Sequence, residues 1–169
     1  MIRWKIFLFF LLPIILSLEP KEYTSVITFE ESGPSSSGSG VEIEGTEAKI
    51  VSGGSFLITG EANEGNVVVS VDSVNLFLEN LNLASNITAP IIINSKLNDI
   101  SITSIDNVFL KNTQSPNATT GECATIKIKK KSQVTINCEK YFSLISESKN
   151  VIKGGKNHQL NSRNPMVNI

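Results

Sequence analysis

Apolar residues occupy every second position through much of residues 66–85, which read NVVVSVDSVNLFLENLNLAS. Because successive side chains of a strand point to opposite faces, this period of two predicts short strands with one buried face. The runs are interrupted only at Asp72-Ser73 and Glu79-Asn80, without the Gly-containing dipeptides that tight hairpins favour. The pattern therefore indicates bends between strands that continue in a coil, whose aliphatic side chains stack from one turn to the next.

A short unit repeats through the rest of the chain: two polar residues, then an aliphatic residue, any residue and a second aliphatic residue. It occurs at residues 72–76, 98–102, 106–110 and 132–136, with a weaker copy at 149–152. Residues 112–122, NTQSPNATTGE, are rich in turn formers and are interpreted as an insertion that lengthens one interval. Helical periodicity is nearly absent beyond the N-terminal segment, and hairpin signals are scarce after Gly65. An all-β parallel β-helix (β-solenoid) is therefore favoured over a sandwich or an up-and-down barrel.

Residues 1–17 have the layout of a secretory signal peptide. Arg3 and Lys5 precede an apolar run at residues 6–16, which is short for a membrane span, and Ser17 is a small residue suited to cleavage. A retained signal anchor is the alternative. Cleavage would give a secreted or cell-surface protein that has no membrane span.

The remaining chain divides into three parts by composition. Residues 18–40, which contain SGPSSSGSG, are predicted to be a flexible Ser/Gly-rich linker, because Gly and Ser bury little apolar area. Residues 41–155 form the predicted β-helix domain, and residues 156–169 form a predicted irregular tail. Since a solenoid needs its open end covered, either the tail folds over that end or the chain is part of a longer solenoid.

Charge is distributed unevenly along the chain, although the formal net charge is only −1. Most of the acidic residues precede residue 65, whereas ten basic residues follow from Lys111 onward. This uneven charge distribution would steer an acidic ligand to the C-terminal half. The alternative is that these charges only form a solvated surface. Nucleic acid is not expected as a partner.

The sequence IKIKKKSQ at residues 126–133 holds the densest group of positive charges. If its two isoleucines point inward, Lys127 and Lys129 point outward and the next two lysines lie at a corner. Such a face can hold uronate or sulfate groups by point charges, and the alternative is a solvated strand face. Exposed aromatic side chains, such as an outward-pointing Phe109, would add stacking with neutral sugars. The candidate ligand-binding residues are Lys127, Lys129, Lys130, Lys131 and Tyr141.

Three aspartates lie at predicted corners: Asp72, Asp99 and Asp106. Corners of neighbouring turns stack, so these carboxylates could converge on calcium, which takes about six to eight oxygen ligands. The alternative is that each aspartate only forms a turn, because Asp and Asn tolerate the left-handed backbone that corners require.

Cys123 and Cys138 are the two cysteines of the chain, and the predicted secretory route permits a disulfide between them. Their expected places at opposite ends of one side of a coil argue against it, since bridged Cα atoms lie within about 7 Å. The pairing therefore stays open. Asn86 and Asn117 begin Asn-X-Thr triplets and are predicted glycosylation sites.

Several of these motifs resemble a carbohydrate-binding family that has a parallel β-helix of pectate-lyase-like architecture. The matching stretches are residues 53–60 (GGSFLITG), 61–65, 69–83, 89–93 and Lys96, within residues 41–155. The resemblance implies a right-handed single-stranded β-helix that binds acidic polysaccharide such as polygalacturonate. It also implies calcium held by acidic side chains and the absence of lyase activity.

The sequence thus predicts a secreted or cell-surface, non-catalytic carbohydrate-binding module for acidic, uronate-rich polysaccharide. A structural or adhesive surface β-solenoid is the alternative, and a degenerate polysaccharide lyase is less favoured. Lyase chemistry needs a base and cations that stabilise the developing charge. After signal removal the remaining arginine is Arg163, in the predicted tail, so the chain is not expected to be an enzyme.

Overall fold

The computed structural model describes residues 21–115, 124–147, 150–154, 159–163 and 167–168, and these described residues form strands and turns without a helix. The ten-stranded sheet contains β1 (Ser25–Glu30), β2 (Gly33–Gly38), β5 (Gly54–Ala62), β7 (Val74–Ser85), β9 (Ile100–Ser104), β10 (Val108–Asn112), β12 (Gln133–Cys138), β13 (Phe142–Ser146), β15 (Gln159–Arg163) and β16 (Val167–Asn168). The six-stranded sheet contains β3 (Val41–Glu44), β4 (Glu47–Ile50), β6 (Asn66–Val69), β8 (Ile91–Ile93), β11 (Ala124–Ile128) and β14 (Asn150–Gly154). The all-β prediction is confirmed.

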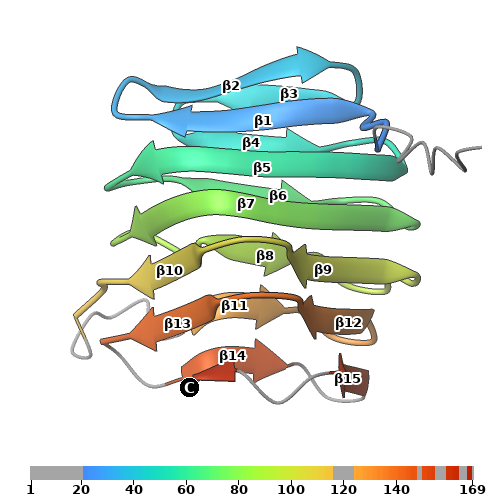
Figure 1. Cartoon of the computed structure of the whole chain (residues 1–169). Helices are drawn as coiled ribbons and strands as arrows, with labels where there is room; N and C mark the ends of the chain where they lie inside the picture. Colours follow the sequence, from blue (N-terminus) through green and yellow to red (C-terminus); the bar gives the residue numbers. More distant parts are fainter. Residues whose placement is uncertain (1–20, 116–123, 148–149, 155–158, 164–166, 169) are drawn as a thin grey trace, which may run out of the picture.

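From β4 onward the chain passes alternately between the two sheets, and from β5 onward each strand pairs in parallel with a strand of the previous passage (Figure 1). We call one passage through both sheets a circuit. Because the circuits stack in chain order, residues distant in sequence become neighbours in space. The acidic first part of the chain and the basic later part therefore lie towards opposite ends of the stack.

The register gives the length of each circuit. Val74 pairs with Ile100, 26 residues later, whereas Ile100 pairs with Val134, 34 residues later. The longer circuit contains the turn-rich residues 112–122, which agrees with their interpretation as an insertion; residues 116–123 lie outside the described part.

Aliphatic side chains from both sheets pack into one core between them. The residues predicted to point inward from the opening motif are buried: Val67, Val69, Val74, Leu76, Leu78, Leu81 and Leu83 are each no more than 1% exposed. Val71 is half-buried against the same core. Burying such side chains stabilises the fold by about 1.5–3 kcal/mol each.

The predicted bend at Glu79-Asn80 does not separate two strands. β7 continues through it, with Asn80 in a left-handed conformation (φ 45°). The division occurs in the next circuit, where β9 pairs with the first half of β7 and β10 with the second. By contrast, the bend at Asp72-Ser73 is present, and Ser73 has a positive φ of 56°.

The prediction of a flexible linker over residues 18–40 is wrong for β1 and β2. Ile27 and Phe29 of β1 belong to the core, and β1 pairs with β5. The Ser/Gly-rich β2 joins β1 as an antiparallel edge strand, for which backbone hydrogen bonds suffice and a large apolar side chain is not required. Pro34 and the exposed serines of this edge also discourage pairing with other chains.

The predicted irregular tail at residues 156–169 contains two further strands. β15 extends the sheet beyond β12, and β16 extends it beyond β13, so backbone pairing continues where the sequence lacks a strong alternating pattern. The described residues include no helix that is long and apolar enough to cross a membrane.

Candidate functional site

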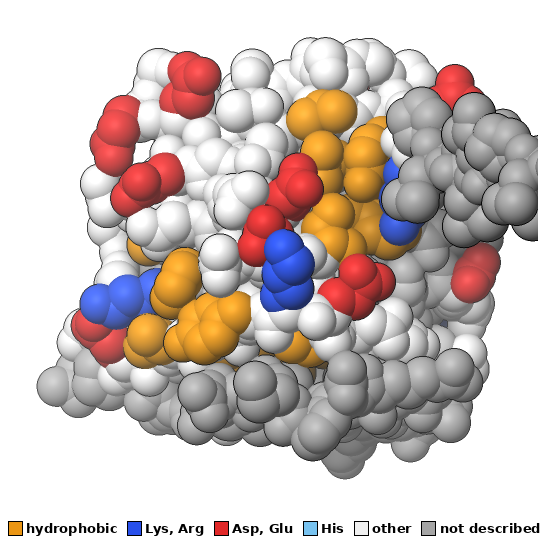
Figure 2. Space-filling view, viewed as in Figure 1, with side chains coloured by type: hydrophobic (Ala, Val, Ile, Leu, Met, Phe, Trp, Pro, Cys, Tyr) orange, Lys and Arg blue, Asp and Glu red, His pale blue; other side chains and the backbone are white. Residues whose placement is uncertain are grey.

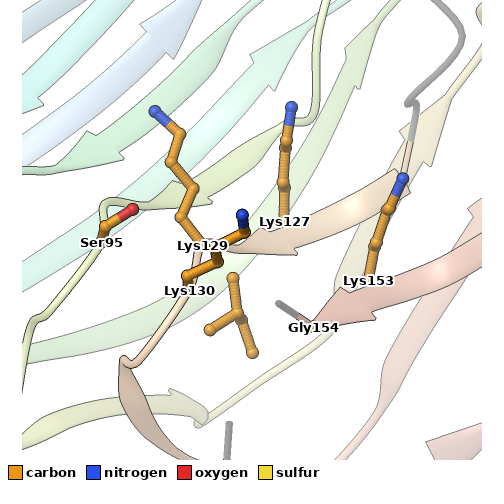
Figure 3. A pocket seen from close by; sticks show the side chains of 7 residues that line it. Ser95, Lys127, Lys129, Lys130, Lys153 and Gly154 are labelled. Atoms are coloured by element: carbon orange, nitrogen blue, oxygen red, sulfur yellow. The ribbon is translucent and has the colours of Figure 1, made fainter. Parts of the chain in front are cut away.

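Four lysines and one serine line a concavity of about 380 Å³ beside β11 and β14 (Figure 3). We call the set Ser95, Lys127, Lys129, Lys130 and Lys153 the lysine surface. The alternation predicted for β11 is confirmed, because Ile126 and Ile128 are buried whereas the lysines between and after them reach the surface.

Register brings lysines together that lie far apart in the sequence. Lys127 stands directly opposite Lys153 of β14. The Nζ of Lys129 donates a hydrogen bond of 2.7 Å to Oδ1 of Asn94, whose Nδ2 donates one of 3.1 Å to Oγ of Ser70. This polar ladder fixes the direction of Lys129 along the outer face.

The corner after β11 stacks on the corner after β8. The N–H of Lys96 donates to the carbonyl of Lys130 at 3.0 Å, and buried Ser132 accepts the N–H of Leu97. Lys96 and Lys131 both have positive φ angles, 66° and 63°. Lys130 and Lys131 are therefore corner residues, as predicted, and Lys96 adds a third exposed lysine beside them.

Local electrostatics leave this corner positively charged. Ion pairs in the described part of the chain include those of Lys49 with Glu42, Lys111 with Glu147 and Lys140 with Asp106. None of these pairs involves the corner lysines Lys96, Lys130 and Lys131. An anion that binds there would not have to displace a carboxylate of the described chain.

Tyr141 lies away from the lysine surface, because it precedes β13 on the ten-stranded sheet. Tyr141 is 39% exposed and packs against Phe109, which is 44% exposed, with ring centroids 5.3 Å apart. The structure thus divides the predicted ligand-binding residues between two faces, and it confirms that Phe109 points outward.

The three predicted calcium ligands have separate surroundings. Oδ1 of Asp72 accepts the N–H of Asn98 at 2.7 Å, and Asp99 occupies a left-handed corner (φ 57°). Asp106 lies between β9 and β10, where it accepts the N–H of Asn107 and pairs with Lys140. Among the described residues no group of three His, Cys, Asp or Glu side chains is placed to hold a metal. These contacts are those of turn formers, and calcium binding stays a prediction.

The remaining predicted positions are only partly described. Asn86 is exposed, as glycosylation requires, and its N–H donates to Glu64 at 2.8 Å. Asn117 and Cys123 lie outside the described residues, whereas Cys138 is buried at the end of β12. The disulfide and both glycans stay predictions.

A second aromatic group lies nearer the start of the ten-stranded sheet. Tyr23 packs on Phe77 with ring centroids 5.7 Å apart, and the Nζ of Lys21 lies 3.2 Å from the centre of the Phe77 ring. Burial, followed by the negative charges of Glu79 and Glu139, raises the pKa of Tyr23 above its usual value. These three residues contact one another, and both aromatic residues are partly buried.

Comparisons of the chain with family models, with curated proteins and with solved structures find no match. The assignment of function therefore depends on the residues themselves. Sequence reasoning missed Ser95, Lys96 and Lys153, which reach the lysine surface or its corner only through the register of stacked circuits. The repeated polar-polar-aliphatic unit carries that register and could have located them.

Proposed function

We propose that the chain is a non-catalytic carbohydrate-binding module, secreted or at the cell surface, that binds a uronate-rich or sulfated polysaccharide through its lysine surface. We further propose that its architecture is a right-handed single-stranded parallel β-helix. The order of strands supports this architecture, since successive circuits pair in parallel from β4 onward.

The gathering of Lys127, Lys129, Lys130 and Lys153 around one open concavity carries the functional proposal. An ammonium group is a strongly hydrated point charge that attracts carboxylate and sulfate groups without demanding one geometry. Several such charges on one face suit a polymer that repeats its anionic group, because simultaneous contacts add through effective concentration. An open concavity also lets a long chain pass through it.

A matched pair of triple variants tests the proposal. Replacing Lys129, Lys130 and Lys131 by Gln should strongly reduce retention of the protein on immobilised polygalacturonate or heparin at low salt. Replacing Lys49, Lys111 and Lys140 by Gln removes the same charge from lysines engaged in ion pairs elsewhere, and should reduce retention much less. Retention of the natural protein should fall with added salt, since surface charges are screened beyond about 10 Å at 0.1 M.

Equal losses in the two triple variants would mean that net charge, and not this surface, drives binding. The absence of retention on either polymer would favour the structural or adhesive alternative. The same samples, with calcium and with chelator, test the calcium prediction by a shift in the melting temperature. Production of unsaturated sugars from polygalacturonate, followed by absorbance, would contradict the non-catalytic part.

A further inference from the structure

The ten-stranded sheet carries a second concavity, of about 450 Å³, whose chemistry differs from that of the lysine surface. It is lined by Gly60, Glu61, Asn80, Leu81, Asn82, Asn107 and Phe109. Figure 2 views this side of the molecule, and one of its two groups of hydrophobic side chains lies over β10 and β13. We call Phe109 and Tyr141 the aromatic platform and the adjoining hollow the amide concavity.

Stacked outward positions build this surface in two adjacent columns. In one column Glu61 pairs with Asn82, and Asn82 with Phe109. The Nδ2 of Asn82 donates to Oε1 of Glu61 at 2.8 Å, which orients the amide. Asn80, Asn107 and Tyr141 form the other column, because each directly precedes one of the paired residues Leu81, Val108 and Phe142. Amide and carboxylate groups thus continue directly from the exposed rings.

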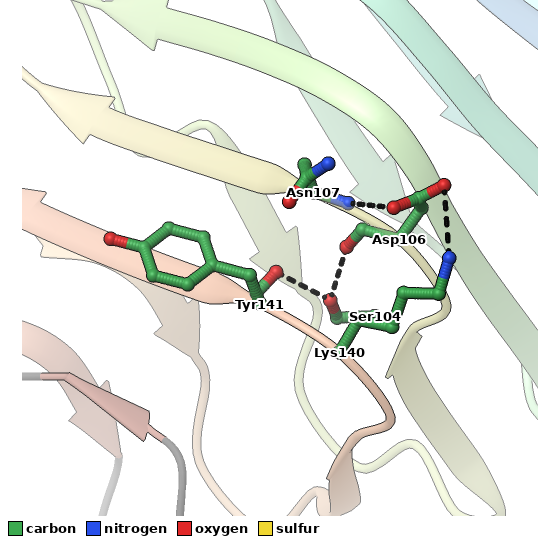
Figure 4. A network of polar contacts seen from close by, with 5 residues as sticks. All are labelled: Ser104, Asp106, Asn107, Lys140 and Tyr141. Atoms are coloured by element: carbon green, nitrogen blue, oxygen red, sulfur yellow. Dashed lines mark hydrogen bonds and ion pairs between the residues drawn. The ribbon is translucent and has the colours of Figure 1, made fainter.

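The buried hydroxyl group of Ser104 contacts the backbone of Tyr141, one of the two platform residues (Figure 4). Ser104 is fully buried, and its Oγ lies 2.9 Å from the carbonyl of Tyr141 and 3.0 Å from that of Asp106. The same Tyr141 carbonyl accepts the N–H of Val108 at 3.1 Å. At the same corner, the Nζ of Lys140 forms an ion pair with Oδ2 of Asp106, 3.4 Å away. The exposed Tyr141 ring therefore projects from a fixed backbone, which lowers the cost of ordering it on binding.

From these contacts we infer that the aromatic platform and amide concavity form a second binding site, for an uncharged pyranose unit of a neutral glycan. One face of such a ring presents aliphatic C–H groups that can stack on Phe109 and Tyr141, whose faces are electron-rich. Its hydroxyl groups donate and accept hydrogen bonds, which matches the amides and the carboxylate of the concavity.

The charge of the lining separates this ligand from the anionic one. Glu61 is the charged side chain among the residues that line the amide concavity, and it would repel a uronate. The nearby cations are engaged, since Lys140 pairs with Asp106 and Lys111 pairs with Glu147 at 2.6 Å. A neutral sugar carries no charge, so Glu61 does not repel it. Its binding also does not require the ion pairs of Lys140 and Lys111 to open.

Nuclear magnetic resonance titration of the full chain with hexasaccharides of glucose, mannose and galactose tests this inference. At least one of them should bind the natural protein, and Phe109→Ala and Tyr141→Ala should each weaken its affinity by about tenfold. Ile145→Ala is the matched control, because Ile145 is 47% exposed on the same sheet but belongs neither to the aromatic platform nor to the lining of the amide concavity; the affinity of this variant should be unchanged.

The inference is wrong if none of the three hexasaccharides binds, or if Ile145→Ala weakens binding as much as Phe109→Ala does. It is also wrong if Phe109→Ala converts a dimer into a monomer without any effect on sugars, since the platform would then be a self-association surface. The triple lysine variant should keep its affinity for the neutral hexasaccharide, so failure of this site and failure of the anionic site are distinguishable.

Discussion

The outer faces of the two sheets differ in chemistry although they enclose one core. Beside the six-stranded sheet, lysines of β11, β14 and a stacked corner face one concavity. On the ten-stranded sheet, amides, Glu61 and Phe109 line another, and the exposed Tyr141 packs against Phe109. Because side chains alternate along each strand, the inward side chains form the common core, whereas the outward side chains can differ between the two faces. The two faces should therefore respond independently to substitution, as distant sites usually do.

The largest effect should come from an alanine substitution at an inner position of a strand, compared with one at the neighbouring outer position. Leu110 is 1% exposed and its neighbour Phe109 is 44% exposed. Leu110→Ala should lower the free energy of unfolding by about 2–5 kcal/mol, because it leaves a cavity in the core. Phe109→Ala should change it by less than about 1 kcal/mol, as surface substitutions do. Urea denaturation compares the two, and similar losses would contradict the separation of core from platform.

Gly60, which lines the amide concavity, gives the next prediction. Gly60 has a φ of +99°, and a Cβ there would overlap the carbonyl oxygen of Phe29. Gly60→Ala should therefore destabilise the protein by about 2–4 kcal/mol. Gly45 also has a positive φ but open space around it, so Gly45→Ala should cost only about 1–2 kcal/mol. Thermal unfolding measures both, and equal costs would rule out the predicted overlap.

Removal of the buried hydroxyl under the platform should have a smaller effect. Ser104→Ala deletes a group placed against two carbonyls and should cost about 1–2 kcal/mol. It should also weaken neutral-sugar binding, because the backbone of Tyr141 loses one of its two supports. Ser101→Ala removes a half-buried hydroxyl on the same strand and serves as the control for both measurements. Unchanged sugar affinity in Ser104→Ala would show that Ser104 does not position Tyr141 for binding.

In contrast to the substitutions above, a substitution at one of the corner lysines should raise stability. Lys131 has a φ of 63°, a conformation that Gly adopts more easily, so Lys131→Gly should raise the free energy of unfolding by about 0.5–1 kcal/mol. The same change should reduce retention on polygalacturonate. Lys130 lies at the same corner without a positive φ, so Lys130→Gly should reduce retention but not raise stability. Denaturation midpoints of the two variants decide this.

The smallest effect concerns Tyr23, which lies outside both proposed sites. Its pKa is raised in the folded protein, so its contribution to stability is fully present below about pH 10, the pKa of the phenol in the unfolded chain. That contribution is lost as the pH rises through the folded pKa. Tyr23→Phe should therefore flatten the alkaline loss of stability, and an unaltered pH profile would count against the shift.

Particular residues show why the sequence predicted some features and missed others. The alternation around Leu76 and Ile126 predicts the core and the outward lysines because it depends only on local periodicity. β2 was missed because its Ser and Gly side chains carry no periodic signal, although its backbone pairs fully with β1. The place of Lys153 beside Lys127 depends on the register between circuits of unequal length. Tyr141, predicted as an aromatic ligand-binding residue, lies on the other sheet from the lysines, and local sequence does not reveal which sheet a residue joins.

A double titration tests the central claim that the two faces bind different glycans independently. Affinities for polygalacturonate and for the neutral hexasaccharide would be measured on three proteins: the natural chain, Phe109→Ala and the Lys129, Lys130 and Lys131 to Gln variant. We predict that Phe109→Ala loses affinity for the neutral sugar alone and that the lysine variant loses affinity for the anionic polymer alone. The loss of both ligands in one variant, or of neither in both, would contradict the account.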